Sequence, residues 1–120
     1  MSKISEQVAE FHRATGCAVR GIPTLAVPEK DLREELIREE FYELKEALAE
    51  DDIVGVADAL ADLVYVVVGA AHTFGIPLDE VLDEVHASNM TKIGGTKRED
   101  GKVQKTAGYR PPNIEEVLGL

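Results

Sequence analysis

The sequence has few of the features that mark exported or membrane-spanning proteins. It contains one cysteine, Cys17, in 120 residues, which excludes an internal disulfide and fits a reducing compartment. The first residues, Met1 to Glu6, have no apolar run behind them, so we expect no signal peptide. The longest apolar run, Leu63 to Ala71, is too short to cross a bilayer. From these absences we expect a cytoplasmic protein that does not enter a membrane.

Basic residues are also scarce, with 13 Lys and Arg against 23 Asp and Glu and a formal net charge of −10. This balance argues against binding to nucleic acid or to an anionic membrane surface. The charge is unevenly spread, because the segment from Lys92 to Arg110 holds six basic and two acidic residues and leaves a net −14 on the rest. A basic segment beside an acidic body suits a ligand that carries phosphates and is bound through a metal.

The chain shows no internal repeat and no low-complexity segment, and its length predicts a single domain, residues 1–120, with a basic C-terminal extension over residues 93–120. Cap residues, glycines and apolar periodicity predict an all-α fold of four helices followed by a short extension. Asp100-Gly101 predicts a small hairpin in that extension. The expected helices run from Ser2 or Ser5 to Gly16, from Pro28 to about Ala49, from Asp51 or Asp52 to Phe74, from Leu78 to Met90, and after Asn113.

The most informative stretch is Glu39-Glu40-Phe41-Tyr42-Glu43, inside the second expected helix. At about 100° per residue, the apolar side chains of this helix form one arc. Glu40 lies inside that arc, whereas Glu39 and Glu43 lie at its edge. A carboxylate on the core-facing side is costly unless a positive group meets it. The arc consists of Leu32, Leu36, Ile37, Phe41, Leu44 and Leu48.

The third expected helix is apolar nearly all round, which is typical of a buried helix. Its one polar line consists of Asp58, Asp62, Tyr65, Gly69 and His72, at steps of four, three, four and three that keep one face. We expect the tyrosine and the histidine to be packed or hydrogen-bonded. A short loop makes neighbouring helices antiparallel, so the two aspartates can face the glutamates of the second helix.

Several carboxylates in one place repel each other when no cation is present. A hard divalent cation relieves that repulsion, and we expect Mg²⁺, with Mn²⁺ as the alternative. Four helices of one chain are too few to cover the apolar third helix, so we expect a homodimer or a larger oligomer, with a compact monomer as the alternative. In the first helix Ile4, Val8 and Phe11 share a face, and we expect His12 and Arg13 on the polar side.

These residues resemble the all-α nucleoside triphosphate pyrophosphatases, namely the MazG-like, dimeric dUTPase-like and phosphoribosyl-ATP pyrophosphatase-like proteins. The resemblance rests on Glu39-Glu40-x-x-Glu43 followed by Leu60-Ala61-Asp62-Leu63-Val64-Tyr65. It continues through the stretch from Glu84 to Lys92 and the tail from Asp100 to Pro111, and covers roughly Phe11 to Pro112.

The resemblance implies a four-helix bundle that forms a homodimer or a homotetramer. It also implies Mg²⁺-dependent cleavage between the α- and β-phosphates of a nucleoside triphosphate, giving a monophosphate and pyrophosphate, in the removal of unwanted nucleotides. It implies that Glu39, Glu40, Glu43 and Asp62 hold metal, with Glu39 and Glu40 as catalytic residues. Asn89 and Lys92 would contact phosphate or sugar. The further substrate-binding candidates are Lys102, Tyr109 and Arg110.

One position departs from the family pattern, because Ala59 stands where the pattern has a glutamate three residues before Asp62. We interpret Asp58 as a substitute ligand, which leaves the number of metals open. Three alternatives to the triphosphate enzyme stand: a phosphoribosyl-ATP pyrophosphatase-like activity, a non-catalytic helical module that binds nucleotide or metal, and an acidic dimerisation bundle without a ligand.

Overall fold

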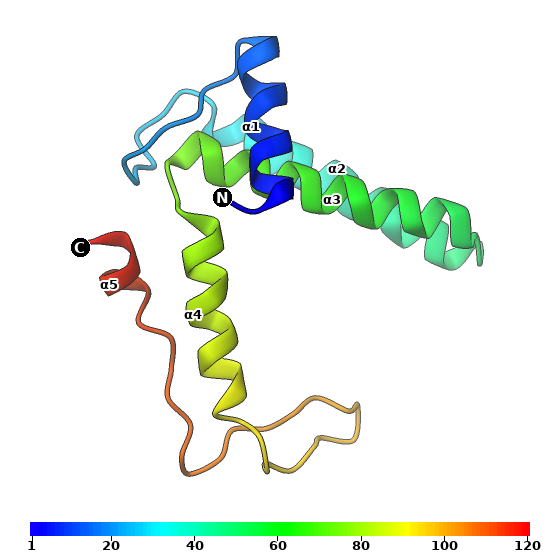
Figure 1. The fold of residues 1–120 in the computed structure, drawn as a ribbon. Helices are drawn as coiled ribbons and strands as arrows, with labels where there is room; N and C mark the ends of the chain where they lie inside the picture. The colour runs from blue at the N-terminus through cyan, green and yellow to red at the C-terminus, as the bar shows by residue number, and fades with distance from the viewer. The chain divides into compact units, whose positions relative to one another are not determined.

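The computed structural model describes residues 1–120 and consists of five helices joined by loops (Figure 1). The all-α prediction is confirmed. The chain forms two compact units, Met1–Ile76 and Pro77–Leu120; that it acts as a single domain, and that four helices form one bundle, stay predictions. The helices are α1 (Lys3–Thr15), α2 (Lys30–Ala49), α3 (Ile53–Phe74), α4 (Leu78–Met90) and α5 (Ile114–Leu118).

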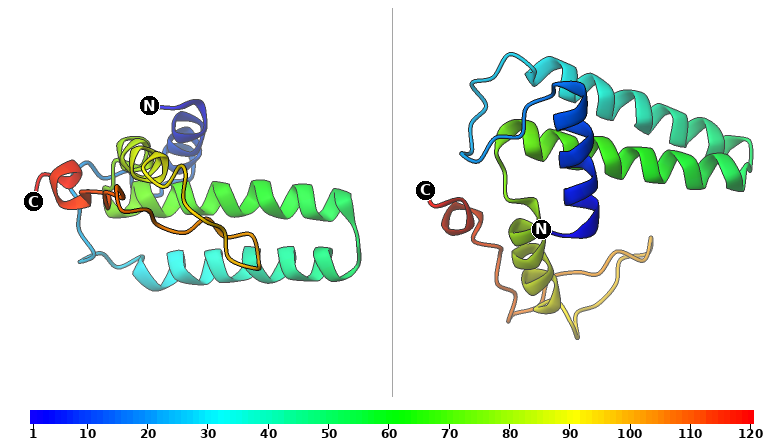
Figure 2. Two further views of the ribbon diagram at one scale, coloured as in Figure 1. Left: turned by 90° about the horizontal axis from the view of Figure 1, so that it is seen from below. Right: turned by 45° about the horizontal axis from the view of Figure 1, so that its top comes forward.

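The first unit is built on the antiparallel pair of α2 and α3, which lie side by side along most of their length (Figure 2). Only three residues join the two helices. Asp51 takes a left-handed backbone conformation with φ of 53°, and the Asp52 side chain caps α3 by accepting a hydrogen bond from the Gly55 amide at 3.0 Å. This tight connection fixes which faces of α2 and α3 meet.

The core of the first unit lies where α1 packs on the C-terminal half of α3. Val8 and Ala9 of α1 are fully buried, and Val68, Ala71 and Thr73 of α3 are buried as well. Further along α3, Leu60 and Val64 are about half exposed. The expectation that this helix is buried all round is therefore wrong for the single chain, because within its unit only α1 and α2 cover it.

By length and composition, α3 is apolar enough to cross a membrane: it has 22 residues, with a mean hydropathy of 2.0 over its most apolar window. The core helix of a soluble protein passes the same test, so the indication is weak. The run from Leu63 to Ala71, which is too short to cross a bilayer by itself, is only part of this helix. Asp58 and Asp62 within α3 speak against a span, since carboxylates are costly in a bilayer.

In the second unit, the chain after α4 turns back and is tied to that helix. The Ser88 hydroxyl donates to the Arg110 carbonyl at 2.8 Å, and the Thr106 hydroxyl donates to the Thr91 carbonyl at 2.9 Å. The expected hairpin is present as a single antiparallel bridge between Lys97 and Val103. The extension is thus a folded loop followed by the short helix α5.

Candidate functional site

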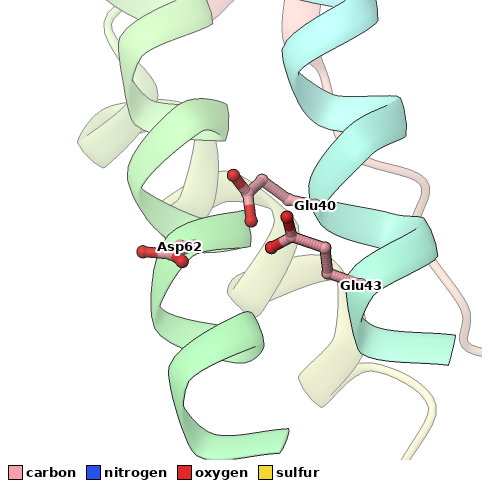
Figure 3. A group of neighbouring side chains, drawn as sticks. All are labelled: Glu40, Glu43 and Asp62. Carbon is pink, nitrogen blue, oxygen red and sulfur yellow. The ribbon is translucent and has the colours of Figure 1, made fainter. Parts of the chain in front are cut away.

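Three carboxylates from two helices converge in the first unit. Glu40 and Glu43 lie one turn apart on α2, and Figure 3 shows both directed toward α3, which carries Asp62. One carboxylate oxygen of each residue lies within 4.8 Å of the others. The antiparallel register set by the short α2–α3 connection is what brings Asp62 opposite the two glutamates.

In this carboxylate cluster, the surroundings of Glu40 disfavour its charged form. Its Oε2 atom is buried and has no hydrogen-bond partner. Burial raises the pKa of Glu40 to about 7, with close contact to Glu43 and the charges of Glu43, Asp62 and Glu39 as further causes. An orphaned carboxylate oxygen beside two more carboxylates is the donor set that a hard divalent cation takes. The residues present therefore fit a metal such as Mg²⁺.

Two predicted metal ligands lie outside the cluster. Glu39 is exposed and contributes only its charge to Glu40. Asp58 is exposed as well, and it lines a separate acidic hollow of about 180 Å³ together with Glu43. Ala59, at the position of the family's glutamate, is buried. The structure thus brings together three of the five predicted ligands, and the role of Asp58 as a substitute ligand stays a prediction.

The predicted phosphate-contacting residues lie in the second unit. Asn89, Lys92 and Lys102 line one hollow of about 450 Å³ beside the Gly94-Gly95 turn. Tyr109 does not line it, but its ring lies 5.7 Å from the Lys92 ammonium. The Arg110 guanidinium is paired with the carboxylate of Glu84 at 3.2 Å. The hollow therefore gathers an amide and several ammonium groups, a chemistry suited to phosphate oxygens.

Our prediction for His12 was wrong. Instead of lying on the polar side of α1, His12 is buried, and its Nδ1 atom is 2.9 Å from the Ala18 carbonyl oxygen. The reason is that Ser5, Val8 and Ala9 share its face, which packs against α3. Phe11, predicted to share a face with Ile4 and Val8, is nearly half exposed.

The other polar residues on α3 lie as expected. Tyr65 packs edge-to-face on Phe11, with ring centroids 5.8 Å apart. The Nε2 atom of His72 lies 2.8 Å from the Ser5 carbonyl oxygen. Both side chains have structural partners, which agrees with the prediction that they are packed or hydrogen-bonded.

The sequence analysis missed Arg33, which is buried on α2. A signal was present, since Arg33 lies three and four residues before Leu36 and Ile37 and seven before Glu40, on the apolar arc. Most arginines are exposed, so this position on the arc did not by itself single out Arg33.

Comparison with known proteins supports the predicted all-α fold. A virus protein, the uncharacterized protein L479 of Acanthamoeba polyphaga mimivirus, is 34% identical over 79 residues, a stretch that covers 62% of this chain and 32% of the viral protein. The chain thus spans about a third of the length of this relative. The family described as phosphoribosyl-ATP pyrophosphohydrolase matches residues 8–89, which include all three clustered carboxylates. This match confirms the predicted resemblance and supports a pyrophosphohydrolase-like function. Since it takes in both helices of the cluster and more than half of the sequence, the chain belongs to the phosphoribosyl-ATP pyrophosphohydrolase family.

Proposed function

We propose that this protein is a Mg²⁺-dependent pyrophosphohydrolase that cleaves a nucleoside triphosphate to the monophosphate and pyrophosphate. The observation that carries the proposal is the convergence of Glu40, Glu43 and Asp62 around a buried, unpartnered carboxylate oxygen. Membership of a pyrophosphohydrolase family supports the reaction type. A phosphoribosyl-ATP substrate is the alternative, since it presents the same bond between its α- and β-phosphates.

In this proposal Glu40, Glu43 and Asp62 hold the metal. When bound, Mg²⁺ supplies neutralisation of phosphate oxygens and makes water more acidic. Glu39 is exposed next to the cluster and outside it, so its carboxylate is free to accept a proton from the attacking water and to orient that water. Phosphoryl transfer depends mainly on positioning and on charge stabilisation, and this division of roles provides both.

Substrate contacts in the second unit fall to the lysine-rich hollow. Lys92 and Lys102 offer ammonium groups to phosphate oxygens of the substrate, and Asn89 adds an amide beside them. Tyr109 supports Lys92 through a cation–π contact. Arg110 is the weakest of the proposed substrate contacts, because its guanidinium is already paired with Glu84.

We further propose that the protein acts as a homodimer or homotetramer in the cytoplasm. The exposed apolar side chains of α3, among them Leu60, Val64 and Val67, support a partner copy, since water contact with a contiguous apolar face is unfavourable. The single cysteine supports a reducing compartment. A role in clearing unwanted nucleotides follows from the proposed reaction.

The direct test is pyrophosphate release from a panel of ribo- and deoxyribonucleoside triphosphates and phosphoribosyl-ATP, with Mg²⁺, with Mn²⁺ and with a chelator. We expect metal-dependent release from one or a few triphosphates. Release from phosphoribosyl-ATP alone would replace the proposed substrate by the alternative. No release from any compound, with the protein folded, would contradict the enzymatic proposal.

A non-catalytic nucleotide-binding module is a second candidate, and a specific observation favours it. Ala59 replaces a family glutamate, and Asp58 lies outside the cluster, so the site has fewer ligands than the family pattern. Calorimetric titration with a triphosphate and Mg²⁺ separates the two candidates. Saturable binding without product would establish the module, whereas binding with turnover would establish the enzyme.

A further inference from the structure

A second cavity in the first unit is not explained by the proposed chemistry. It has a volume of about 430 Å³ and is bounded by residues of α1, α2 and α3. Two of its aromatic walls pack edge-to-face, with an angle of 71° between the rings. Apolar and aromatic walls of this kind suit a flat, weakly polar group. The apolar lining consists of Phe11, Leu32, Leu36, Tyr65 and Val66.

Arg33 is the one charged residue of this cavity wall. It is 6% exposed, and its buried Nε atom has no hydrogen-bond partner. The side chain forms no ion pair either: the nearby Glu29 is paired with Arg20 at 2.6 Å. A guanidinium cannot lose its proton to relieve burial, so a buried, unpartnered one is costly unless a ligand accepts its hydrogen bonds.

His12 lines the same cavity and offers the opposite hydrogen-bonding character. Its Nδ1 atom must carry the hydrogen, because it faces the Ala18 carbonyl oxygen at 2.9 Å. Burial lowers the pKa of His12, and the charges of Arg33 and His72 lower it further, against the Ala18 hydrogen bond. The ring is therefore neutral at pH 7, and Nε2 is a hydrogen-bond acceptor.

Gly69 of α3 lets the side chains of His12 and Arg33 approach this helix closely. A Cβ atom at this position would lie 3.0 Å from His12 Nε2 and 3.1 Å from Arg33 Nη1. Any side chain here would occupy the place where the acceptor and the donor approach each other. Gly69, on the polar line of α3, thus marks the place where a donor and an acceptor lie near each other.

We propose that this cavity binds the base of the nucleotide, and that Arg33 and His12 select bases with a carbonyl oxygen next to a ring N–H. Arg33 donates to the carbonyl oxygen, and His12 Nε2 accepts from the ring N–H. Guanine, hypoxanthine, uracil and thymine present that edge. Adenine and cytosine lack it, because their ring nitrogen at this edge is an acceptor next to an amino group.

The position of the cavity fits this assignment, which rests on the proposed function. Arg33 precedes Glu40 by seven residues on one face of α2, a separation of two turns or about 10 Å. That spacing leaves room for a sugar between a base at Arg33 and phosphates at the carboxylate cluster. A phosphate would also accept from Arg33, but apolar walls and a neutral imidazole favour a base over an anion.

The test is a calorimetric titration of the full-length protein with nucleoside 5′-monophosphates, in chelator so that neither metal nor turnover is needed. We expect guanosine, inosine, uridine and thymidine monophosphates to bind about ten-fold or more tightly than those of adenosine and cytidine. Arg33→Met should remove this preference. Arg13→Met, which changes an exposed arginine on α1, should leave it intact.

Two outcomes of that titration would overturn the base pocket: no binding of any monophosphate, or equal binding of all six. Inorganic phosphate and ribose 5-phosphate form a further arm, and Arg33-dependent binding of either would identify an anion site instead. If Arg33→Met does not fold, Arg33→Lys keeps the charge but loses the fork of donors. Retention of full base preference in Arg33→Lys would likewise contradict the proposal.

The outcomes for the base pocket and for the hydrolytic reaction are separable. Base-selective, Arg33-dependent binding without pyrophosphate release would uphold the pocket and reject the reaction. Metal-dependent pyrophosphate release whose base preference is unchanged in Arg33→Met would uphold the reaction and reject the pocket.

Discussion

Two charged residues on the same face of α2 respond in different ways to the burial of a polar atom. Glu40 and Arg33 lie seven residues apart, and each has a buried polar atom without a hydrogen-bond partner. Glu40 can take up a proton, and its pKa of about 7 reflects that response. Arg33 has no such response, because a guanidinium keeps its charge at any ordinary pH. Glu40 can therefore stay neutral until a cation binds, whereas a buried arginine needs an acceptor at all times.

The difference between Glu40 and Arg33 also indicates which groups a ligand must carry. Such a ligand would bring cation-bound phosphates to the carboxylate cluster and an acceptor oxygen to Arg33, two helical turns away. A nucleotide has both ends. The four predictions that follow test the carboxylate cluster and Arg33 separately, or remove the difference between Glu40 and Arg33.

The largest expected effect is that of Glu40→Gln on turnover. The amide keeps the shape of the side chain but removes the charge that holds the metal, so hydrolysis should fall by a factor on the order of a thousand. Monophosphate binding in chelator should stay unchanged, because it depends on Arg33. Initial rates of pyrophosphate release and calorimetry measure the two effects.

The matched control for that change is Glu35→Gln, an exposed glutamate on the same helix, which should retain full activity. Undiminished turnover in Glu40→Gln would remove this residue from the mechanism. Loss of monophosphate binding in the same variant would show that the carboxylate cluster and the cavity at Arg33 are not independent.

Arg33→Met should raise the free energy of unfolding of the nucleotide-free protein by roughly 1 kcal/mol, since an unpartnered buried donor is removed while the apolar stem remains. Denaturant titration measures the change, and Arg13→Met should leave stability within about 0.5 kcal/mol of the wild type. A large loss of stability in Arg33→Met would mean that the arginine supports the fold itself.

The pKa of Glu40 predicts a pH dependence in the absence of metal. In the folded chain this carboxyl holds its proton up to about pH 7, whereas in the unfolded chain it loses the proton near its ordinary value of 4.5. The folded state thus binds more protons between these values, so the contribution of Glu40 to stability is present below pH 4.5 and lost as pH rises toward 7.

The measurement is the melting temperature in chelator across that window, taken as the difference between wild type and Glu40→Gln. The difference is needed because His12, whose pKa is lowered, contributes stability that is lost as pH falls below its unfolded value of 6.5, with the opposite slope. A pH-independent difference would contradict the raised pKa. Added Mg²⁺ should raise the melting temperature more at high pH, where protons no longer compete.

The smallest expected effect is that of Gly69→Ala. The added methyl lies between His12 and Arg33 at about 3 Å from each and should weaken base preference several-fold, on the scale of about 1 kcal/mol. Helix propensity offsets the crowding by a similar amount, so stability should barely change. Gly21→Ala, where a Cβ would meet nothing, is the control, and unchanged preference in Gly69→Ala would argue against a ligand at this point.

Much of the fold could be predicted because its signals are local. Asp52 as a cap, glycines at the ends of α1 and α3, and Pro77 before α4 locate the helix ends within a few residues. The same periodicity placed Glu40 on the apolar arc of α2. It could not decide burial, since Leu32 and Phe41 share that arc and are about half exposed. Burial depends on which neighbours are present, and only α1 and α3 are available to α2 in its unit.

By itself, the sequence determined the all-α class, the helix ends and the pairing of Glu40 and Glu43 with an aspartate of the next helix, because each follows from spacing along one chain. Only the tertiary structure decided that Asp62 joins the glutamates while Asp58 does not, and that His12 and Arg33 are buried around Gly69. These outcomes depend on the angle and register at which helices meet. That geometry is set by packing between distant residues, for which no local pattern exists.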